Sequence, residues 1–375
     1  MGKKILFVDN LLWSVVNFRG FIIRRLRDEG YRVVLVAPKE GEYGKTINYL
    51  PEGVRFIPVK MDRCGTNPFH DFAYFRTLLK IYRKERPDYI FHYTIKPNIY
   101  GTVAASSLGI PCTSLIAGLG YAFSEGGFSK HVAAYLYKKA IRHATKVFTL
   151  SEDNYNFLLS NGICLPDRTI WLHGGEGVDL KAYPFMPNAG EPPRFLLVGR
   201  MLADKGYYEF VEAARIVRTK HPEVHFQLLG TVDPSYPLNI PLDRIYEDVD
   251  SGAVEYLGTT DNIQAEEGKR GTVVVLPSYH EGMSRALMEA LSMGKPVITT
   301  DIPGCRETVE EGKNGFLVPK RDGKALAEAC FRYISLSAEQ KEAFSLHSRK
   351  MAEEIFDIEK VYVEYKKVLT ESIGK

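Results

Sequence analysis

The densest group of side chains suited to chemistry lies between residues 277 and 290. Glu281 stands between an apolar run and a helical pattern that begins near Ser284, and Glu289 lies inside that helix, after seven intervening residues. A carboxylate accepts hydrogen bonds from two neighbouring hydroxyls, such as those of a sugar. The alternative is that Glu281 belongs to an ordinary helix start and Glu289 to a solvated helix face. The spacing alone leaves both interpretations open.

The backbone around these glutamates suits an anion. Gly282 lets the chain approach a ligand closely because glycine has no Cβ. Met283 and Ser284 lie where the helix begins, and the amides of a helix start point unpaired N–H groups at a phosphate. The segment therefore predicts a site for a molecule that carries both hydroxyls and phosphates.

Two cations form a second candidate group. Arg200 and Lys205 follow the apolar run 194–198 and precede a helical pattern. Fixed positive charges at this place would stabilise negative charge that develops on a departing phosphate. The alternative is that both are surface salt-bridge partners, which is the usual role of a lone Arg or Lys.

Strands and helices must position these residues, and the chain alternates the two patterns throughout. Continuous apolar runs separated by amphipathic helices predict parallel sheets covered on both faces. Ligands of such sheets bind at the carboxyl ends of the strands, near helix N-termini. The predicted strands are 4–8, 32–37, 54–59, 89–93, 112–116, 146–150, 194–198, 225–229, 254–257, 272–276, 296–299 and 316–318.

The run 183–193 interrupts this alternation with four prolines and a glycine in eleven residues, as interdomain linkers do. We predict an N-terminal domain over 1–185, a C-terminal domain over 186–350 and a final helix over 351–375. Residues 1–190 carry 25 Lys and Arg against 16 Asp and Glu, whereas the remainder carries 24 against 30. The two halves are therefore expected to meet different partners.

The composition excludes several classes of protein. With 375 residues, of which 45% are hydrophobic and 25% charged, the chain is too apolar to be disordered and long enough for two domains. Five cysteines without a C-x-x-C pair argue against a disulfide framework or a zinc site and favour a reducing cytoplasm. No apolar run reaches the roughly 18 residues of a membrane span. No metal-binding carboxylate cluster is visible, so no metal and no other cofactor is expected.

The C-terminal half resembles the retaining family 4 glycosyltransferases. Segments in the family's order carry the resemblance: Gly177-Val178-Asp179; 198–206, with Gly199, Arg200 and Lys205; 252–258; and 277–315, with Glu281, Glu289 and Gly294-Lys295-Pro296. The resemblance implies an α/β fold of the GT-B type, in which two Rossmann-like, doubly wound domains face each other across a cleft. It also implies that the C-terminal helix returns to the N-terminal domain.

The same resemblance implies that the C-terminal domain binds a UDP-sugar without a metal. Arg200 and Lys205 would hold the donor diphosphate, Glu281 would contact the transferred sugar, and Glu289 would contact the ribose. Glu281, Arg200 and Lys205 are then the catalytic candidates. The implied donor-binding residues are Gly199, Arg200, Lys205, Glu281, Gly282, Met283, Ser284 and Glu289.

The N-terminal half is similar to bacterial enzymes that extend undecaprenyl-diphosphate-linked sugars in N-glycan, capsule and O-antigen assembly. The segments 93–101 and 117–121 carry this similarity, which implies a polyprenyl-diphosphate-linked saccharide as the acceptor. Lys96 would pair with the lipid diphosphate, or it caps the following turn. The predicted acceptor-binding residues are Asn17, Arg19, Lys96, Asn98, Gly118, Leu119 and Gly120.

Two features depart from the family pattern. The turn 117–120 lacks the histidine that many members carry there, and His92 lies within a strand, which favours a core role. No protein base is then evident, which is consistent with a front-face mechanism in which the departing phosphate takes the acceptor proton. The family's glycine-rich loop is replaced by 10–17, which contains no glycine, and Asn17 and Arg19 stand at the start of the next predicted helix.

The segment 128–146 contains five cationic residues and no acid. A basic amphipathic helix with aromatic residues suits an anionic membrane surface. The alternative is a packed domain helix with a solvated basic face. No nucleic-acid motif accompanies the segment, so a nucleic-acid partner is not expected. The residues predicted to meet the membrane are Lys130, Lys138, Lys139 and Arg142.

Together, the residues and the resemblance predict a retaining transferase that moves a hexose or N-acetylhexosamine from a UDP-sugar to a polyprenyl-diphosphate-linked saccharide. It would be cytoplasmic and peripheral on the inner face of the cell membrane. A nucleotide-sugar epimerase on the same fold, and a non-catalytic donor- or lipid-binding partner subunit of another transferase, stay open as alternatives. An NAD dehydrogenase is not favoured, because no G-x-G-x-x-G follows the first strand.

Overall fold

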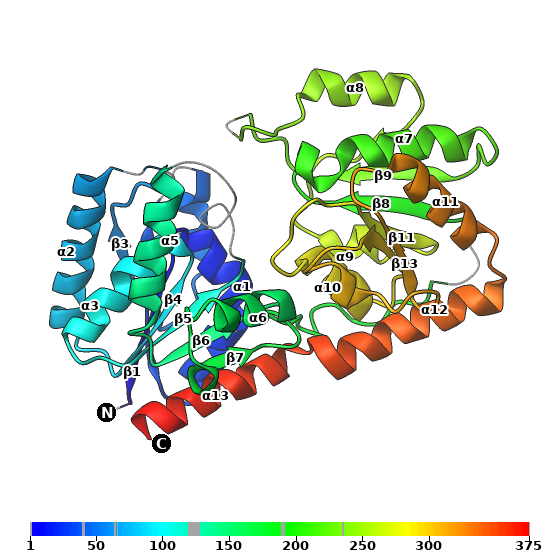
Figure 1. The fold of residues 1–375 in the computed structure, drawn as a ribbon. Coiled ribbons are helices and arrows are strands. Elements are labelled where there is room, and N and C mark those ends of the chain that lie inside the picture. The colour runs from blue at the N-terminus through cyan, green and yellow to red at the C-terminus, as the bar shows by residue number, and fades with distance from the viewer. Residues whose placement is uncertain are drawn as a thin grey trace. The chain divides into compact units, whose positions relative to one another are not determined.

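The computed structural model describes residues 2–39, 42–63, 65, 67–118, 128–188, 192–234 and 236–374, with the side chains of 42–45 and 128–134 outside the description. The chain divides into two compact units (Figure 1). Unit 1 contains Met1–Glu176 and Glu359–Lys375, and unit 2 contains Gly177–Ile358. The first division falls at Glu176, ahead of the predicted boundary at 185, and the chain re-enters unit 1 at Glu359 rather than at 351.

Unit 1 is built on a parallel sheet of seven strands in the order β3-β2-β1-β4-β5-β6-β7. Phe7 of the interior strand β1 lies opposite Leu35 of β2 on one side and Phe91 of β4 on the other. The apolar side chains of this strand are fully buried, as expected where helices cover both faces. The strands are β1 (Lys4–Val8), β2 (Arg32–Pro38), β3 (Arg55–Val59), β4 (Tyr89–Tyr93), β5 (Cys112–Ile116), β6 (Lys146–Thr149) and β7 (Thr169–Trp171). The helices are α1 (Leu12–Asp28), α2 (Pro68–Glu85), α3 (Thr102–Ser107), α5 (Phe128–Ile141) and α6 (Glu152–Ser160), with short helical turns η1 (Glu42–Tyr49), η2 (Pro97–Gly101) and η3 (Pro166–Arg168).

Unit 2 repeats the plan with a parallel sheet of six strands in the order β10-β9-β8-β11-β12-β13. Its main core joins the sheet to the covering helices through aromatic side chains such as Phe195, Phe210 and Phe226. The strands are β8 (Arg194–Val198), β9 (His225–Leu229), β10 (Glu255–Tyr256), β11 (Thr272–Leu276), β12 (Val297–Thr300) and β13 (Gly315–Val318). The helices are α7 (Tyr207–Arg218), α8 (Leu242–Asp250), α9 (Ile263–Glu267), α10 (Arg285–Ser292), α11 (Gly323–Ile334) and α12 (Ala338–Met351), with η4 (Ala203–Lys205), η5 (Arg306–Thr308) and η6 (Ala352–Phe356).

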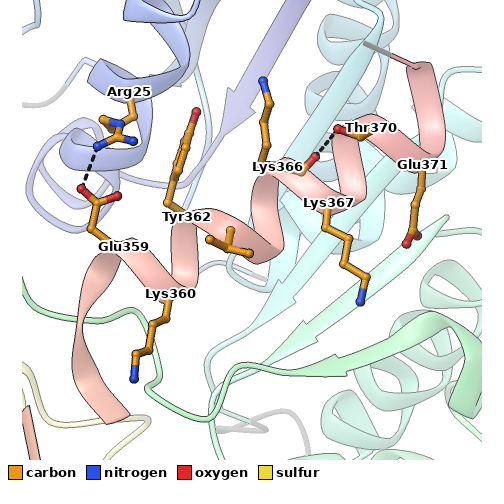
Figure 2. A pocket seen from close by; sticks show the side chains of 9 residues that line it. Arg25, Glu359, Lys360, Tyr362, Lys366, Lys367, Thr370 and Glu371 are labelled. Atoms are coloured by element: carbon orange, nitrogen blue, oxygen red, sulfur yellow. Dashed lines mark hydrogen bonds and ion pairs between the residues drawn. The ribbon is translucent and has the colours of Figure 1, made fainter. Parts of the chain in front are cut away.

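The last helix, α13 (Ile358–Ile373), packs with unit 1, as the resemblance implied. The Tyr365 ring lies 4.8 Å from the ring of Phe91, and its hydroxyl is 3.0 Å from that of Tyr93. Arg25 of α1 pairs with Glu359 at 2.7 Å, next to a pocket along α13 (Figure 2). The C-terminal segment is therefore part of the core of unit 1.

The first helix of unit 1 begins before Asn17, where the sequence predicted its start. α1 starts at Leu12, so most of the segment 10–17, which was expected as a loop, is helical. Leu12 and Val15 are buried and extend the apolar face that continues at Ile22. Because the helix must cover the sheet from its first turn, Asn17 lies within the helix rather than at its start.

Candidate functional site

The first candidate group lies where two neighbouring strands of unit 2 end. β8 and β11 pair in parallel, with Leu196 opposite Val274, so the turns that follow them share one edge of the sheet. Lys205 of the first turn pairs with Glu281 of the second, with 2.5 Å between Nζ and Oε1. Ser278 donates from its hydroxyl to the same carboxylate oxygen at 2.8 Å. The structure thus brings two of the predicted catalytic residues into contact.

Two glycines allow these turns to pack closely. Gly206 has a φ of +80°, and a Cβ there would lie 2.3 Å from the backbone oxygen of Pro277. Gly304 has a φ of +84°, and a Cβ there would lie 2.8 Å from the backbone oxygen of Gly282. Only glycine combines this conformation with such close contacts. Backbone packing therefore fixes the position of both turns.

The start of α10 differs from its predicted role. The N–H of Ser284 donates to the carbonyl of Gly304 at 2.9 Å, so this amide is not available to a phosphate. The Ser284 hydroxyl caps the helix by accepting from the N–H of Leu287 at 3.4 Å. Gly282 and Met283 are half-buried and stay candidates for donor contacts.

Arg200 presents its guanidinium to solvent, directly after Gly199, whose φ is +152°. The guanidinium carbon lies 4.5 Å from the centroid of the Tyr236 ring, a cation–π contact that orients the side chain. Among the residues that the structure describes, no carboxylate lies within ion-pair distance of Arg200. The positive charge is therefore available to a phosphate.

Glu289 is buried, so the alternative interpretation, which placed it on a solvated helix face, is wrong. Its side chain is 6% exposed, and Arg285 donates to it from Nε at 2.6 Å. Burial, the charge of Glu289 and a hydrogen bond to that carboxylate raise the pKa of the Tyr183 hydroxyl. Contact with a ribose stays a prediction for this residue.

Two buried titratable side chains, those of Glu267 and Lys295, interact electrostatically with each other, and no role was predicted for either. Glu267, the last residue of α9, is fully buried, and neither carboxylate oxygen has a hydrogen-bond partner in the described part of the chain. Burial raises its pKa well above the usual range, the charge of Glu289 adds to the rise, and Lys295 opposes it. Burial also lowers the pKa of Lys295 to about 8, and its ammonium donates to backbone carbonyls and to Asn188. In the sequence Glu267 resembles any charge on a short solvated helix, so no signal marked it.

In unit 1, Arg19 is engaged by its neighbours. Its side chain is 6% exposed and pairs with Glu176, and the Asp9 carboxylate lies 3.8 Å away. The guanidinium also donates to the Ser14 hydroxyl at 3.1 Å and stacks over the Tyr93 ring at 4.3 Å. An acceptor diphosphate would have to displace Glu176 to reach it.

Lys96 follows β4 as predicted, and it has a protein partner. Its ammonium pairs with the carboxylate of Asp71 in α2 at 2.5 Å and donates to the carbonyl of Gly65 at 2.7 Å. Tyr100 donates to the other oxygen of Asp71 at 2.8 Å. Thr94, two residues before Lys96, has a φ of +67°, a strained conformation of the kind that concentrates at functional sites. A contact between Lys96 and a lipid diphosphate stays a prediction.

The other predicted acceptor residues fall into different environments. Asn98 is fully buried, and its amide donates to the Leu115 carbonyl at 2.9 Å and to the Tyr137 hydroxyl at 3.1 Å. The amide nitrogen thus links β5 to α5, and a contact of the buried Asn98 side chain with the acceptor stays a prediction. Asn17 and Gly118 are exposed, and Leu119 and Gly120 lie outside the described residues.

His92 has the core role that was predicted for it. The ring is fully buried, with Nε2 2.9 Å from the hydroxyl of Tyr82 and Nδ1 3.4 Å from that of Thr102. Burial lowers its pKa to about 3, so the imidazole is neutral near pH 7.

The basic helix α5 uses part of its charge locally. Lys138 and Arg142 donate to the carbonyls of Asn161 and Gly162, just after α6, at 2.7 and 3.0 Å. Lys139 is exposed and lies 5.6 Å from the Tyr135 ring, while the side chain of Lys130 lies outside the description. Within the residues described, no helix combines the length and the apolar character needed to cross a membrane. The same residues include no group of three or more His, Cys, Asp or Glu side chains that could hold a metal ion.

Two protein-family models match the chain. The model for glycosyl transferase 4-like domains matches residues 4–151, and the model for glycosyl transferases group 1 matches residues 192–335. Together they match more than three quarters of the chain, and each lies within one unit of the fold. The chain therefore belongs to the GT-B glycosyltransferases that combine these two domains.

Particular relatives are similar over most of their length. The chain is 29% identical over 345 residues to the N,N'-diacetylbacillosaminyl-diphospho-undecaprenol alpha-1,3-N-acetylgalactosaminyltransferase of Campylobacter jejuni, covering 87% of this chain and 88% of the relative. It is 26% identical over 391 residues to the capsular polysaccharide biosynthesis glycosyltransferase CapM of Staphylococcus aureus, covering 100% of both. The crystal structure of Anabaena Alr3699/HepE in complex with UDP has a TM-score of 0.78 at 17% identity, covering 98% of this chain and 100% of that one.

Proposed function

We propose that this protein is a retaining glycosyltransferase that moves a hexose or N-acetylhexosamine from a UDP-sugar to a polyprenyl-diphosphate-linked saccharide during cell-surface glycan assembly. The observation that carries the proposal is the contact between Lys205 and Glu281 at the shared edge of β8 and β11, in the half that matches the group 1 model. The undecaprenol-diphosphate substrate in the name of the Campylobacter relative supports this acceptor class, and the UDP complex among structures of the same fold supports the donor.

The charges of the donor group fit transfer from a nucleoside diphosphate. Arg200 and Lys205 would bind the diphosphate, whose negative charge increases as the bond between the sugar C1 and the phosphate oxygen breaks. Glu281 would accept hydrogen bonds from the sugar hydroxyls once the phosphate takes over Lys205. Because these cations can balance the leaving group, we expect no metal requirement.

The transfer step balances without a protein base. The acceptor hydroxyl oxygen forms a new bond to C1 on the face from which UDP departs, and its proton passes to a phosphate oxygen of UDP. His92 cannot serve as the base, since it is fully buried in the core of unit 1. The lipid-linked acceptor would be met at the inner face of the cell membrane.

The first test is a panel of UDP-sugars assayed for thermal stabilisation of the full chain. A bound donor raises the apparent stability by mass action, and the correct sugar should raise Tm by several degrees at saturating concentration. The Glu281→Ala variant should lose transfer to an undecaprenyl-diphosphate-linked acceptor while staying folded. Glu342→Ala, which removes an exposed carboxylate from α12, is the matched control.

Three outcomes would contradict the proposal. The first is the absence of stabilisation by every UDP-sugar, and the second is wild-type transfer by Glu281→Ala. The third is isomerisation of a UDP-sugar without any acceptor, which would identify an epimerase. Loss of activity after EDTA treatment, restored by a divalent cation, would overturn the expected metal independence.

A further inference from the structure

One helix of unit 1 combines exposed aromatic side chains with exposed cations. Phe69 and Phe72, in the first turns of α2, are 82% and 58% exposed. The opposite side of the helix buries Tyr74, Leu78 and Tyr82 against the sheet of unit 1. Figure 1 shows α2 beside α3 within that unit. Two large aromatic rings therefore face outward although the helix has a complete buried face of its own.

Cations continue the same side of the helix. Residues 69, 72, 76, 80 and 83 are spaced by three or four, so they form one stripe along α2. Arg76, Lys80 and Arg83 are exposed, as is the neighbouring Lys84. In the part of the chain that the structure describes, no carboxylate lies within ion-pair distance of these four cations. We call the six residues the α2 surface: Phe69, Phe72, Arg76, Lys80, Arg83 and Lys84.

Both acids of α2 are neutralised on other sides of the helix. Asp71 pairs with Lys96 at 2.5 Å and is 14% exposed. Glu85 is 5% exposed and pairs with Lys4 at 3.2 Å and with Arg55. The exposed stripe is therefore entirely cationic and aromatic, without compensating negative charge from its own helix.

The basic helix α5 offers a useful contrast. Lys138 and Arg142 are bound to the carbonyls of Asn161 and Gly162, so half of the cations predicted to meet a membrane are occupied. Among the described residues, the cations of the α2 surface have no such partners. The structure therefore favours α2 over α5, the helix that the sequence predicted, as the membrane-binding surface.

We propose that the α2 surface docks unit 1 on a bilayer rich in anionic lipids, with Phe69 and Phe72 entering the headgroup region. Aromatic rings and lysine or arginine side chains on one helix face are the combination that binds such an interface. The inference rests on the proposed function, since a polyprenyl-linked acceptor resides in a membrane. Each cation near an anionic surface contributes about five-fold to binding, and the contribution weakens with salt.

The test is co-sedimentation of the full chain with vesicles of phosphatidylcholine alone or mixed with equal phosphatidylglycerol. The wild type should bind the mixed vesicles and not the neutral ones, and binding should weaken as salt increases. The double variant R76E/K80E should reduce the partition coefficient by about 25-fold or more, since two contributions of about five-fold are lost. F69S/F72S should reduce binding at low and at high salt alike.

Matched controls separate this surface from total charge. K220E/K324E makes the same charge change on exposed residues of unit 2, and K139E/R142E makes it at the C-terminal end of α5 and directly after it. Both should bind within about three-fold of wild type. Binding of the α2 variants at the level of these controls would overturn the proposal, and so would self-association through the two phenylalanines, detected by light scattering without vesicles.

A separate measurement keeps the two proposals distinguishable. Transfer to a short-chain prenyl-diphosphate acceptor without vesicles should be unchanged in R76E/K80E and F69S/F72S. If no transfer is found for any variant, the proposed function fails while the vesicle result still decides the α2 surface. If transfer is intact and the variants bind vesicles normally, only the α2 surface is wrong.

Discussion

Unit 1 and unit 2 share a parallel α/β architecture but use the cations near their strand ends differently. In unit 1, Arg19 pairs with Glu176 and Lys96 pairs with Asp71, and all four side chains are largely covered. In unit 2, Arg200 is exposed, and Lys205 pairs with Glu281, which is itself a predicted donor ligand. In unit 2, Lys205 can therefore exchange Glu281 for a substrate phosphate, because both residues belong to the same candidate site.

The different partners of these cations show that a cation placed after a strand does not by itself define a phosphate site. Lys96 and Lys205 each follow a fully buried strand, β4 and β8. The partner of Lys96 is Asp71 of a neighbouring helix, whereas the partner of Lys205 comes from the adjacent turn of the same candidate site. The neighbours of each cation, which belong to the tertiary structure, decide its availability.

Removing Lys205 and Lys96 in separate variants tests whether the two units differ in how they use these cations. Lys205→Ala should lower kcat/KM for transfer by about 100- to 1000-fold, because a fixed donor to the developing phosphate charge is lost. Lys96→Ala should cost about ten-fold or less, since Asp71 already competes for this ammonium. Steady-state rates with one UDP-sugar and one acceptor measure both effects, and Lys220→Ala controls for loss of an exposed charge. Equal losses in the two variants would remove the distinction between the units.

Alanine substitutions at two glycines compare how strongly the backbone is constrained in a turn of each unit. Gly206→Ala should destabilise the protein by about 2 kcal/mol or more, because the new methyl group meets the Pro277 carbonyl in a left-handed backbone. Gly118→Ala should change the stability by about 0.5 kcal/mol or less, since a Cβ there meets no atom of the described residues within 4 Å. Urea unfolding followed by circular dichroism measures both. A tolerated Gly206→Ala would show that the turn before α7 is less constrained than its contacts indicate.

Two buried titratable groups, one in each unit, should make stability depend on pH in opposite directions. Glu267 has a raised pKa, so the folded state holds its proton more tightly and stability falls as pH rises above about 4.5. His92 has a pKa lowered to about 3, so its contribution is lost in the opposite direction, as pH falls below about 6.5.

Glu267→Gln should therefore become progressively more stable than wild type between pH 5 and pH 8, by at most about 1.4 kcal/mol per pH unit. The difference between the unfolding midpoints of the variant and the wild type isolates this group from Glu289 and Lys295. A difference that does not change with pH would mean that Glu267 titrates normally in the folded protein.

The sequence alone determined the alternation of strands and helices, because buried parallel strands are short apolar runs. β1, β4, β5, β8, β9 and β11 match their predicted bounds. The short strand β7 and the helix α8 were not predicted, since Thr169–Trp171 is too brief and the residues Leu242–Asp250 too polar to give a clear pattern. The start of α1 was missed because the segment 10–17 was interpreted as the counterpart of the family's glycine-rich loop.

The sequence by itself also predicted Arg200, Lys205 and Glu281 as one candidate group, because they lie in short, ordered motifs after strands, and the structure brings Lys205 and Glu281 into contact. The placement of strand ends at one sheet edge then brings such residues together. Only the tertiary structure decided which groups are paired or exposed. Asp71 pairs with Lys96, the Gly304 carbonyl accepts from the amide of Ser284, and Glu267 is buried with no hydrogen-bond partner among the described residues. The physical reason is that burial and pairing depend on residues distant in the chain, whereas strand ends and turns depend on adjacent ones.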